Sequence, residues 1–240
     1  MAIIQTHPSS DELAHAAADH FATLAQEAIH DHGKFSVALA GGSTPRATYE
    51  ILATIEYAQK INWERVHVFW GDERLVPPDH QDSNYRMASE AMLKVIPIPN
   101  ENIHRIHGEA KPHDAAREYA ETIRDFFNPH STSIDLILLG MGDDGHTASI
   151  FPGTEAVFED SLNVMAHYVE KLNSWRITFT PRLINAAQNV TFLVSGERKA
   201  RRLRQVLVGP YQPEILPSQV VRPSQGRLRW LVDEAAALHL

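Results

Sequence analysis

One histidine in this sequence directly follows two carboxylates and a glycine, a combination that suits proton transfer. The stretch is Gly140-Met-Gly-Asp-Asp-Gly-His146, and it comes after the apolar run Ile134 to Leu139. Glycines let the backbone pass close to a small ligand, and a carboxylate can orient and charge-stabilise an imidazole that takes a proton from water. A lone histidine is more often structural, but its position after a predicted strand and a glycine–acid turn favours function. We therefore expect His146 to act as a general base beside Asp144, with Asp143 shaping the turn.

A second glycine turn favours an anionic ligand. Gly41, Gly42, Ser43 and Thr44 follow the short apolar run 35–39, and a proline then begins a predicted helix. The N–H groups and the helix dipole at such a turn attract anions, and the two hydroxyls add hydrogen-bond donors. The segment lacks the Gly-Lys-Ser/Thr ending of a Walker loop. An ordinary capped turn between a strand and a helix would contain the same residues, so the turn alone leaves both readings open.

Two cations and a carboxylate follow further predicted strands. Asp72 and Arg74 come directly after the apolar run 66–70, and Lys199 comes shortly after the run 190–194. A guanidinium grips phosphate or carboxylate in fork geometry, a carboxylate can bind sugar hydroxyls, and the lysine could be a second phosphate ligand. The alternatives are a surface salt bridge for Arg74 and a solvated helix face for Lys199.

Other motif matches carry less weight. The turn after residue 139 matches G-x-G-x-x-G, but it comes late in the chain and its two acids would repel a pyrophosphate, so no nicotinamide cofactor is expected. His104 with His107, and His30 with His32, have pairwise spacing that suits a metal, but neither pair has a third ligand at motif spacing. We expect no metal site. A Gly-x-Ser-x-Gly elbow is missing from the sequence, which argues against a serine-hydrolase triad.

A scaffold must bring these segments together, and the pattern of the chain predicts one. Apolar strands alternate with helices, which predicts an α/β fold with a mostly parallel, Rossmann-like sheet covered on both faces, in one domain over residues 1–240. Ligands bind beyond the carboxyl ends of the strands in such sheets. The segments after Leu39, Trp70, Leu139 and Val194 are therefore expected to form one site. The predicted strands are 35–39, 66–70, 103–106, 134–139, 164–169, 177–180, 190–194 and 228–232.

Helix boundaries are also indicated by the sequence. Ser9-Ser-Asp-Glu12 is a capping box that starts a helix, and Gly33 is a plausible stop. Pro45 suits the first turn of a second helix. Ser83 can cap a helix through residue 93, and the segment 111–127 has amphipathic spacing.

Composition excludes several classes of protein. The 240 residues carry a net charge of −8, which does not favour nucleic acid or an anionic membrane as a partner. The sequence contains no cysteine, no evident signal peptide and no apolar run long enough to span a membrane, so a cytoplasmic protein is expected. Whether it is a monomer or a homodimer stays open.

Five blocks of the sequence, in this order, resemble the 6-phosphogluconolactonase family. They are Ala40–Pro45, Gly71–Arg74 with His80–Tyr85, Gly140–Gly153, Arg176–Thr180 and Gly196–Lys199. The resemblance implies a three-layer α/β/α sandwich, shared with glucosamine-6-phosphate deaminases and ribose-5-phosphate isomerases. It implies hydrolysis of a phosphorylated sugar lactone, 6-phosphogluconolactone, to 6-phosphogluconate in the oxidative pentose phosphate pathway, with no cofactor. It also implies that His146 is the base and Asp144 its neighbour, and that Gly42, Ser43, Thr44, Arg74 and Lys199 hold the phosphate.

The sequence departs from the family pattern at one place and argues against two relatives. Prolines are expected just before Arg176, but this chain has Val169-Glu-Lys-Leu-Asn-Ser-Trp175, which leaves the shape of one pocket wall open. The deaminases have a glutamate at the position of Phe151 and a tyrosine at that of Arg74. Sugar-phosphate sensor domains of transcription regulators follow a DNA-binding domain, whereas here about 34 residues precede the first core strand.

Overall fold

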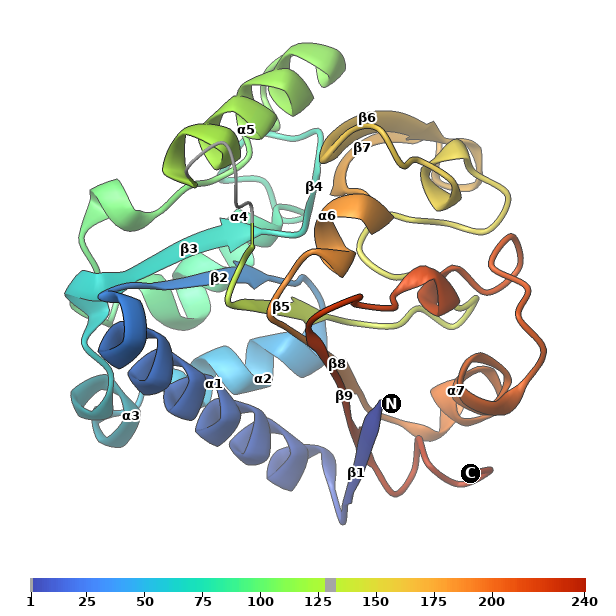
Figure 1. Ribbon diagram of the computed structural model, residues 1–240, viewed down its shortest axis with the longest axis horizontal. Coiled ribbons are helices and arrows are strands. Elements are labelled where there is room, and N and C mark those ends of the chain that lie inside the picture. Colours follow the sequence, from blue (N-terminus) through green and yellow to red (C-terminus); the bar gives the residue numbers. More distant parts are fainter. Residues whose placement is uncertain (1, 128–132) are drawn as a thin grey trace.

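A parallel sheet forms the centre of the molecule. The computed structural model describes residues 2–127 and 133–240, and in these ranges six strands pair in the order β1-β9-β8-β5-β2-β3 (Figure 1). Every pairing in this sheet is parallel. Its strands are β1 (Ile3–His7), β2 (Phe35–Leu39), β3 (Val66–Trp70), β5 (Leu136–Leu139), β8 (Asn189–Val194) and β9 (Arg227–Asp233).

Helices cover the two faces of this sheet. Helices α1 and α2 lie together on one side, and α6 and α7 lie on the other (Figure 1). All residues of β2 and β5 are buried, as expected for strands that are covered on both faces. The predicted α/β sandwich is therefore confirmed. The α-helices are α1 (Ser10–His32), α2 (Ser43–Leu52), α3 (Ile55–Lys60), α4 (Asn84–Ala88), α5 (Pro112–Phe126), α6 (Pro181–Asn185) and α7 (Ala200–Val208).

The first helix begins and ends where the sequence predicts. The Ser9 hydroxyl accepts a hydrogen bond from the Glu12 N–H at 3.2 Å, which satisfies one free donor of the first turn. Gly33 adopts φ +83°, and its N–H donates to the Ile29 carbonyl. Glycine adopts this left-handed conformation at little cost, which is why it commonly closes a helix.

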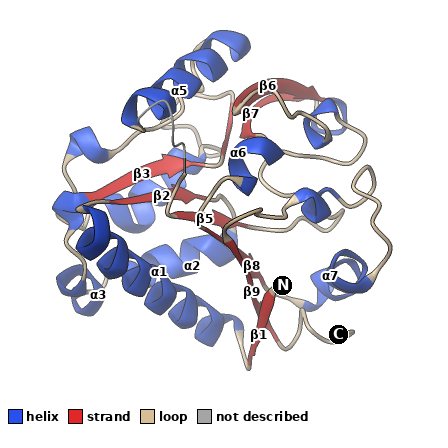
Figure 2. Cartoon of the chain, viewed as in Figure 1, coloured by secondary structure: helices blue, strands red, loops and turns tan. Residues whose placement is uncertain are grey.

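A second, smaller sheet stands beside the first. Its antiparallel strands are β4 (Asp72–Arg74), β7 (Ser174–Phe179) and β6 (Val164–Val169) (Figure 2). The chain crosses between the sheets at Gly71, whose N–H donates to the Leu39 carbonyl at 3.0 Å and whose carbonyl accepts from the Phe179 N–H at 2.7 Å. This crossing carries β4 away from β3 and sets its side chains over the carboxyl end of the central sheet.

Two predicted elements differ from the structure. Residues 103–106 do not form a strand. Ile103 makes a single bridge to Val68, and the His104 carbonyl is instead taken by the Tyr119 hydroxyl at 3.2 Å, so strand pairing cannot continue. The helix capped by Ser83 ends as an α-helix at Ala88 and continues as a π-helical turn over 89–93.

Candidate active site

The four strand-end segments meet in one open basin, which we define as two adjoining chambers of about 270 and 840 Å³. The smaller chamber is lined by the turn 41–44, and the larger by side chains of the small sheet, including Arg176. Asp72, Arg74, His146 and Lys199 line both chambers. An anion bound at the turn would thus lie within the same depression as the imidazole.

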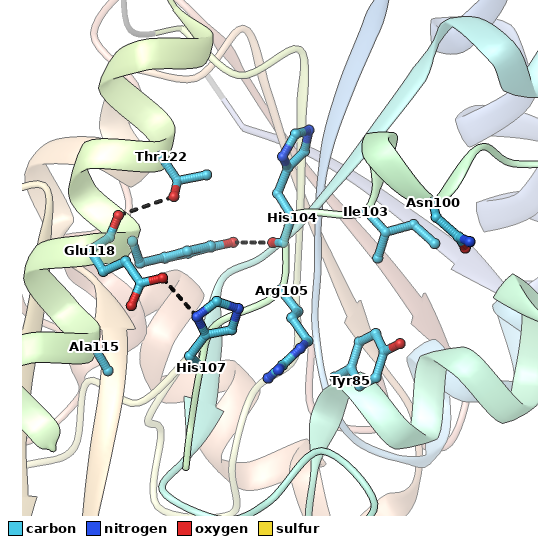
Figure 3. A pocket seen from close by; sticks show the side chains of 10 residues that line it. Tyr85, Asn100, Ile103, His104, Arg105, His107, Ala115, Glu118 and Thr122 are labelled. Carbon is cyan, nitrogen blue, oxygen red and sulfur yellow. Dashed lines mark hydrogen bonds and ion pairs between the residues drawn. The ribbon is translucent and has the colours of Figure 1, made fainter. Parts of the chain in front are cut away.

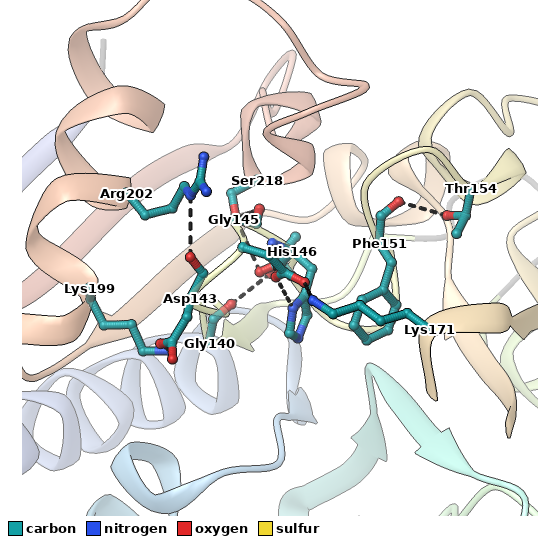
Figure 4. Close-up of polar contacts among 12 residues, drawn as sticks. Gly140, Asp143, Gly145, His146, Phe151, Thr154, Lys171, Lys199, Arg202 and Ser218 are labelled. Carbon is teal, nitrogen blue, oxygen red and sulfur yellow. Dashed lines mark hydrogen bonds and ion pairs between the residues drawn. The ribbon is translucent and has the colours of Figure 1, made fainter. Parts of the chain in front are cut away.

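His146 and Asp144 form a short hydrogen bond, and Figure 4 shows His146 among its neighbours. His146 Nδ1 lies 2.6 Å from Asp144 Oδ1, which also accepts from the His146 N–H at 3.2 Å. A carboxylate can only accept, so the ring proton resides on Nδ1 and Nε2 is left to accept a proton. The hydrogen bond from His146 holds the pKa of Asp144 far below its usual range, and one from Lys171 lowers it further.

The turn that carries this pair is shaped so that only glycine fits at one position. A Cβ atom on Gly142 would lie 2.0 Å from His146 Nδ1 and 2.8 Å from Asp144 Oδ1. The turn is closed by the Gly142 N–H, which donates to the His146 carbonyl at 2.8 Å, and by Thr147 Oγ1, which donates to the Gly140 carbonyl at 2.8 Å. The ring itself stacks on Phe151 with centroids 4.1 Å apart. Packing therefore restricts the position of the imidazole.

The turn 41–44 is packed as tightly as the loop that carries His146. A Cβ atom on Gly41 would lie 2.0 Å from Asn84 Oδ1, and Gly42 adopts φ +101°. Helix α2 begins at Ser43, two residues before the predicted start at Pro45, so Ser43 and Thr44 belong to its first turn. Because Gly42 at the N-cap has no side chain, the first-turn N–H groups point to a space that can take an anion.

The Ala40 backbone, directly before this turn, is clamped by a tyrosine. The buried Tyr49 hydroxyl donates to the Ala40 carbonyl and accepts from its N–H, both at 2.9 Å. Strand end and helix are thereby held together at the point where the turn begins.

The predicted cations lie on the basin wall, with partners that the sequence did not indicate. Lys199 Nζ lies 2.5 Å from Asp143 Oδ1, and this ammonium lowers the pKa of Asp143. Arg74 Nη1 donates to the Asp82 carbonyl at 2.7 Å, whereas its buried Nε has no hydrogen-bond partner among the described residues. The Asp143 carboxylate therefore anchors a lysine, a role that the sequence did not predict.

Asp72 is nearly buried and already hydrogen bonded. Its carboxylate accepts from Ser149 Oγ at 2.7 Å and from Asn84 Nδ2 at 3.3 Å. The expected contact with sugar hydroxyls would add to these bonds, because the residue still lines both chambers.

Arg176 is a basin residue to which the sequence assigned no role. It pairs with Arg74 across strands β4 and β7. Burial lowers the pKa of Arg176, and the neighbouring charge of Arg74 lowers it further. Two adjacent guanidiniums form a strongly anion-attracting wall. Arg176 lies in one of the sequence blocks that resemble the family, so it could have been considered. Its pairing with Arg74, however, depends on the register of two distant strands.

Of the histidines weighed as metal ligands, His104 and His107 lie at a separate cavity of about 330 Å³ (Figure 3), whereas His32 Nε2 pairs with Asp135 at 3.1 Å. His107 Nδ1 pairs with Glu118 at 2.7 Å, whereas the His104 ring contacts His67 at 3.3 Å. Their imidazoles therefore have different partners. In residues 2–127 and 133–240, no group of three or more potential ligands could hold a metal ion.

The fold and this geometry define a class: a three-layer α/β protein whose open basin contains a histidine–aspartate pair, a cross-strand pair of arginines and the start of a helix. A family model described as glucosamine-6-phosphate isomerases/6-phosphogluconolactonase matches residues 8–230. The chain belongs to this family.

Individual relatives agree with the assignment. A 6-phosphogluconolactonase from Nostoc sp. is 42% identical over 99% of this chain and 98% of its own. The structure of 6-phosphogluconolactonase from Trypanosoma brucei matches with a TM-score of 0.86 and 29% identity, covering 100% of this chain and 99% of that one. A monomeric glucosamine-6-phosphate deaminase shares the fold with a TM-score of 0.86 at 19% identity, covering 99% of this chain and 100% of that one. None of the described helices has the length and apolarity that a membrane span needs.

Proposed function

We propose that the chain hydrolyses 6-phosphogluconolactone to 6-phosphogluconate, the second step of the oxidative pentose phosphate pathway, with His146 as the general base. The observation that carries the proposal is the 2.6 Å contact between His146 and Asp144 in a basin shared with the turn 41–44. Relatives that match nearly the full chain are named 6-phosphogluconolactonases, which supports the choice of substrate.

Binding fixes the lactone before the chemistry begins. The phosphate docks on Gly41, Gly42, Ser43 and Thr44, where N–H and hydroxyl donors meet the start of a helix of ten residues. Lys199 and Arg74 supply positive charge from the wall of both chambers. Holding the phosphate at one end leaves the lactone ring to extend past His146 into the larger chamber.

The tautomer of His146 determines which of its ring nitrogens takes the proton. His146 Nε2 takes a proton from water while the water oxygen attacks the lactone carbonyl, and the imidazolium is stabilised by Asp144. The tetrahedral oxyanion is stabilised by positive groups of the wall, for which Arg74 and N–H groups of the loop are the candidates. The oxyanion collapses, the bond to the ring oxygen breaks, and that oxygen takes the proton back from His146. The neutral imidazole of His146 is then ready for another turnover.

We also assign the whole range 1–240 to one catalytic domain. Both sheets contribute to the basin, the central one through its strand ends and the small one through Arg74 and Arg176. Separating them would divide the site.

The deaminase alternative is disfavoured at two positions, Arg74, where the deaminases have a tyrosine, and Phe151. Phe151 packs on the His146 ring where the deaminases have a glutamate, and a phenyl ring cannot transfer protons. Release of ammonia from glucosamine 6-phosphate would support the alternative.

The test uses His146→Ala, with His107→Ala as the matched control at the separate cavity. Proton release from freshly generated lactone is measured against the uncatalysed background. We expect kcat to fall by about 10²–10⁴ in His146→Ala, the usual contribution of a general base, with a smaller change in KM. The control should retain activity. A fully active His146→Ala enzyme would remove this residue from the mechanism.

A further inference from the structure

Asp144 bridges two hydrogen-bond donors from different parts of the fold. Its Oδ1 faces His146 Nδ1 at 2.6 Å, and its Oδ2 accepts from Lys171 Nζ at 2.9 Å (Figure 4). Lys171 belongs to the 3-10 turn Glu170–Leu172 that joins β6 to β7. The carboxylate is therefore held by a hairpin of the small sheet as well as by its own loop.

The hairpin presents Lys171 in a defined position. Strands β6 and β7 pair without a break up to Val169 and Ser174, and the Asn173 N–H donates to the Glu170 carbonyl at 3.0 Å. Asn173 adopts φ +47°, a left-handed conformation that asparagine tolerates better than most residues. This tight turn is the segment in which the expected prolines are missing.

We propose that Lys171 is a positioning residue that sets the pH at which the His146–Asp144 pair becomes competent as a base. It binds the oxygen of Asp144 that His146 does not use, which fixes the carboxylate plane. Its positive charge also opposes uptake of a proton by the pair. This inference rests on the proposed function of His146.

Other charges also face the pair, and they must stay constant in any test. Asp143 is neutralised by Lys199 at 2.5 Å. The remaining charged groups of the larger chamber are Asp72, Arg74 and Asp82 from β4 and the loop after it, Arg176 from β7 and Arg202 from α7.

A neighbouring cavity, also lined by Phe151, adds four titratable groups: Glu155, His167, Tyr168 and Glu170. Burial lowers the pKa of His167, which favours its neutral form. Lys171 is the cation in direct contact with the second oxygen of Asp144, so its removal changes the charge at the pair without moving these groups.

The expected effect is small because Lys171 is exposed. Its side chain is 69% accessible, against 23% for Asp144. A unit charge about 5 Å away in surroundings close to bulk water changes a titration by roughly half a pH unit. Loss of the positive charge makes proton uptake easier, so the base form then requires a higher pH.

The experiment compares Lys171→Met with Lys171→Arg in the full chain, and uses the exposed Lys94→Met as a matched loss of charge away from the basin. The acidic limb of kcat/KM is followed from about pH 5 to 8, since this limb reports the free enzyme. We expect Lys171→Met to move the limb up by about 0.5 pH unit, and Lys171→Arg and Lys94→Met to leave it in place. In about 1 M salt, where the Debye length is about 3 Å, the difference from the wild type should shrink.

Two results would overturn the inference. One is an unchanged limb in Lys171→Met, and the other is a loss of activity that Lys171→Arg does not restore. An NMR titration of the His146 ring, assigned by its absence from His146→Ala, applies the same test without turnover. Failure of the wild type to hydrolyse the lactone would contradict the proposed function, whereas the ring titration would still decide the role of Lys171.

Discussion

The substitution Gly142→Ala tests whether packing fixes the catalytic imidazole. The added Cβ would lie 2.0 Å from His146 Nδ1 and 2.2 Å from Cε1, whereas ordinary contact begins at 3.4 Å. The ring must therefore move by about 1.4 Å, the difference between the 2.0 Å approach to Nδ1 and the 3.4 Å of ordinary contact. Phe151, stacked on the ring at 4.1 Å, hinders that movement, and the 2.6 Å bond to Asp144 cannot survive it.

The cost should appear in catalysis more than in folding. A misplacement of about 1 Å can lower the rate about 10²-fold, so kcat should fall by at least roughly that factor. Overpacking at one position destabilises a protein by about 1–3 kcal/mol, which leaves the fold intact. Initial rates of proton release and a thermal melt by circular dichroism measure the two effects separately.

Gly140→Ala is the matched control in the same loop. A Cβ atom at this position meets no described heavy atom within 4 Å, so we expect kcat within a few-fold of the wild type. Wild-type kcat in Gly142→Ala would refute the reasoning, because the imidazole would then act from a displaced position or not act at all. Equal losses in both variants would indicate a general disturbance of the loop.

Two further predictions concern binding and acid stability. Arg74→Ala should raise KM roughly 10- to 100-fold, the cost of one or two charge-assisted hydrogen bonds, with kcat less affected. Steady-state kinetics measures both constants. An unchanged KM would show that Arg74 does not bind the phosphate. Burial lowers the pKa of His20 and His67 to about 4, from 6.5 in the unfolded chain. The unfolded state therefore binds more protons between these values, so stability is fully present above about pH 6.5 and is lost as the pH falls toward 4. After allowance for partial exposure, the two rings together should contribute about 1–3 kcal/mol to the free energy of unfolding. Urea unfolding measured across this pH range should show a weaker dependence of that free energy on pH in the double variant His20→Gln/His67→Phe than in the wild type.

Local patterns in the sequence were enough to predict most strands of the central sheet and the polar segments that follow them. Apolar runs and caps act locally, so strands such as 35–39 and 66–70 and the boundaries at Ser9 and Gly33 could be predicted from neighbouring residues. The carboxyl ends of parallel strands share one edge whatever their order in the sheet. This rule is why four distant segments could be expected in one basin before their order was known.

Which side chains meet across that basin depends on the packing of the whole chain. The contacts of Lys171 with Asp144, of Lys199 with Asp143 and of Arg74 with Arg176 join segments that no local pattern connects. Each depends on the small antiparallel sheet, on strand register or on the path of a loop. Register and loop path follow from the packing of the whole chain, because a shift of one residue in a strand turns every side chain to the opposite face.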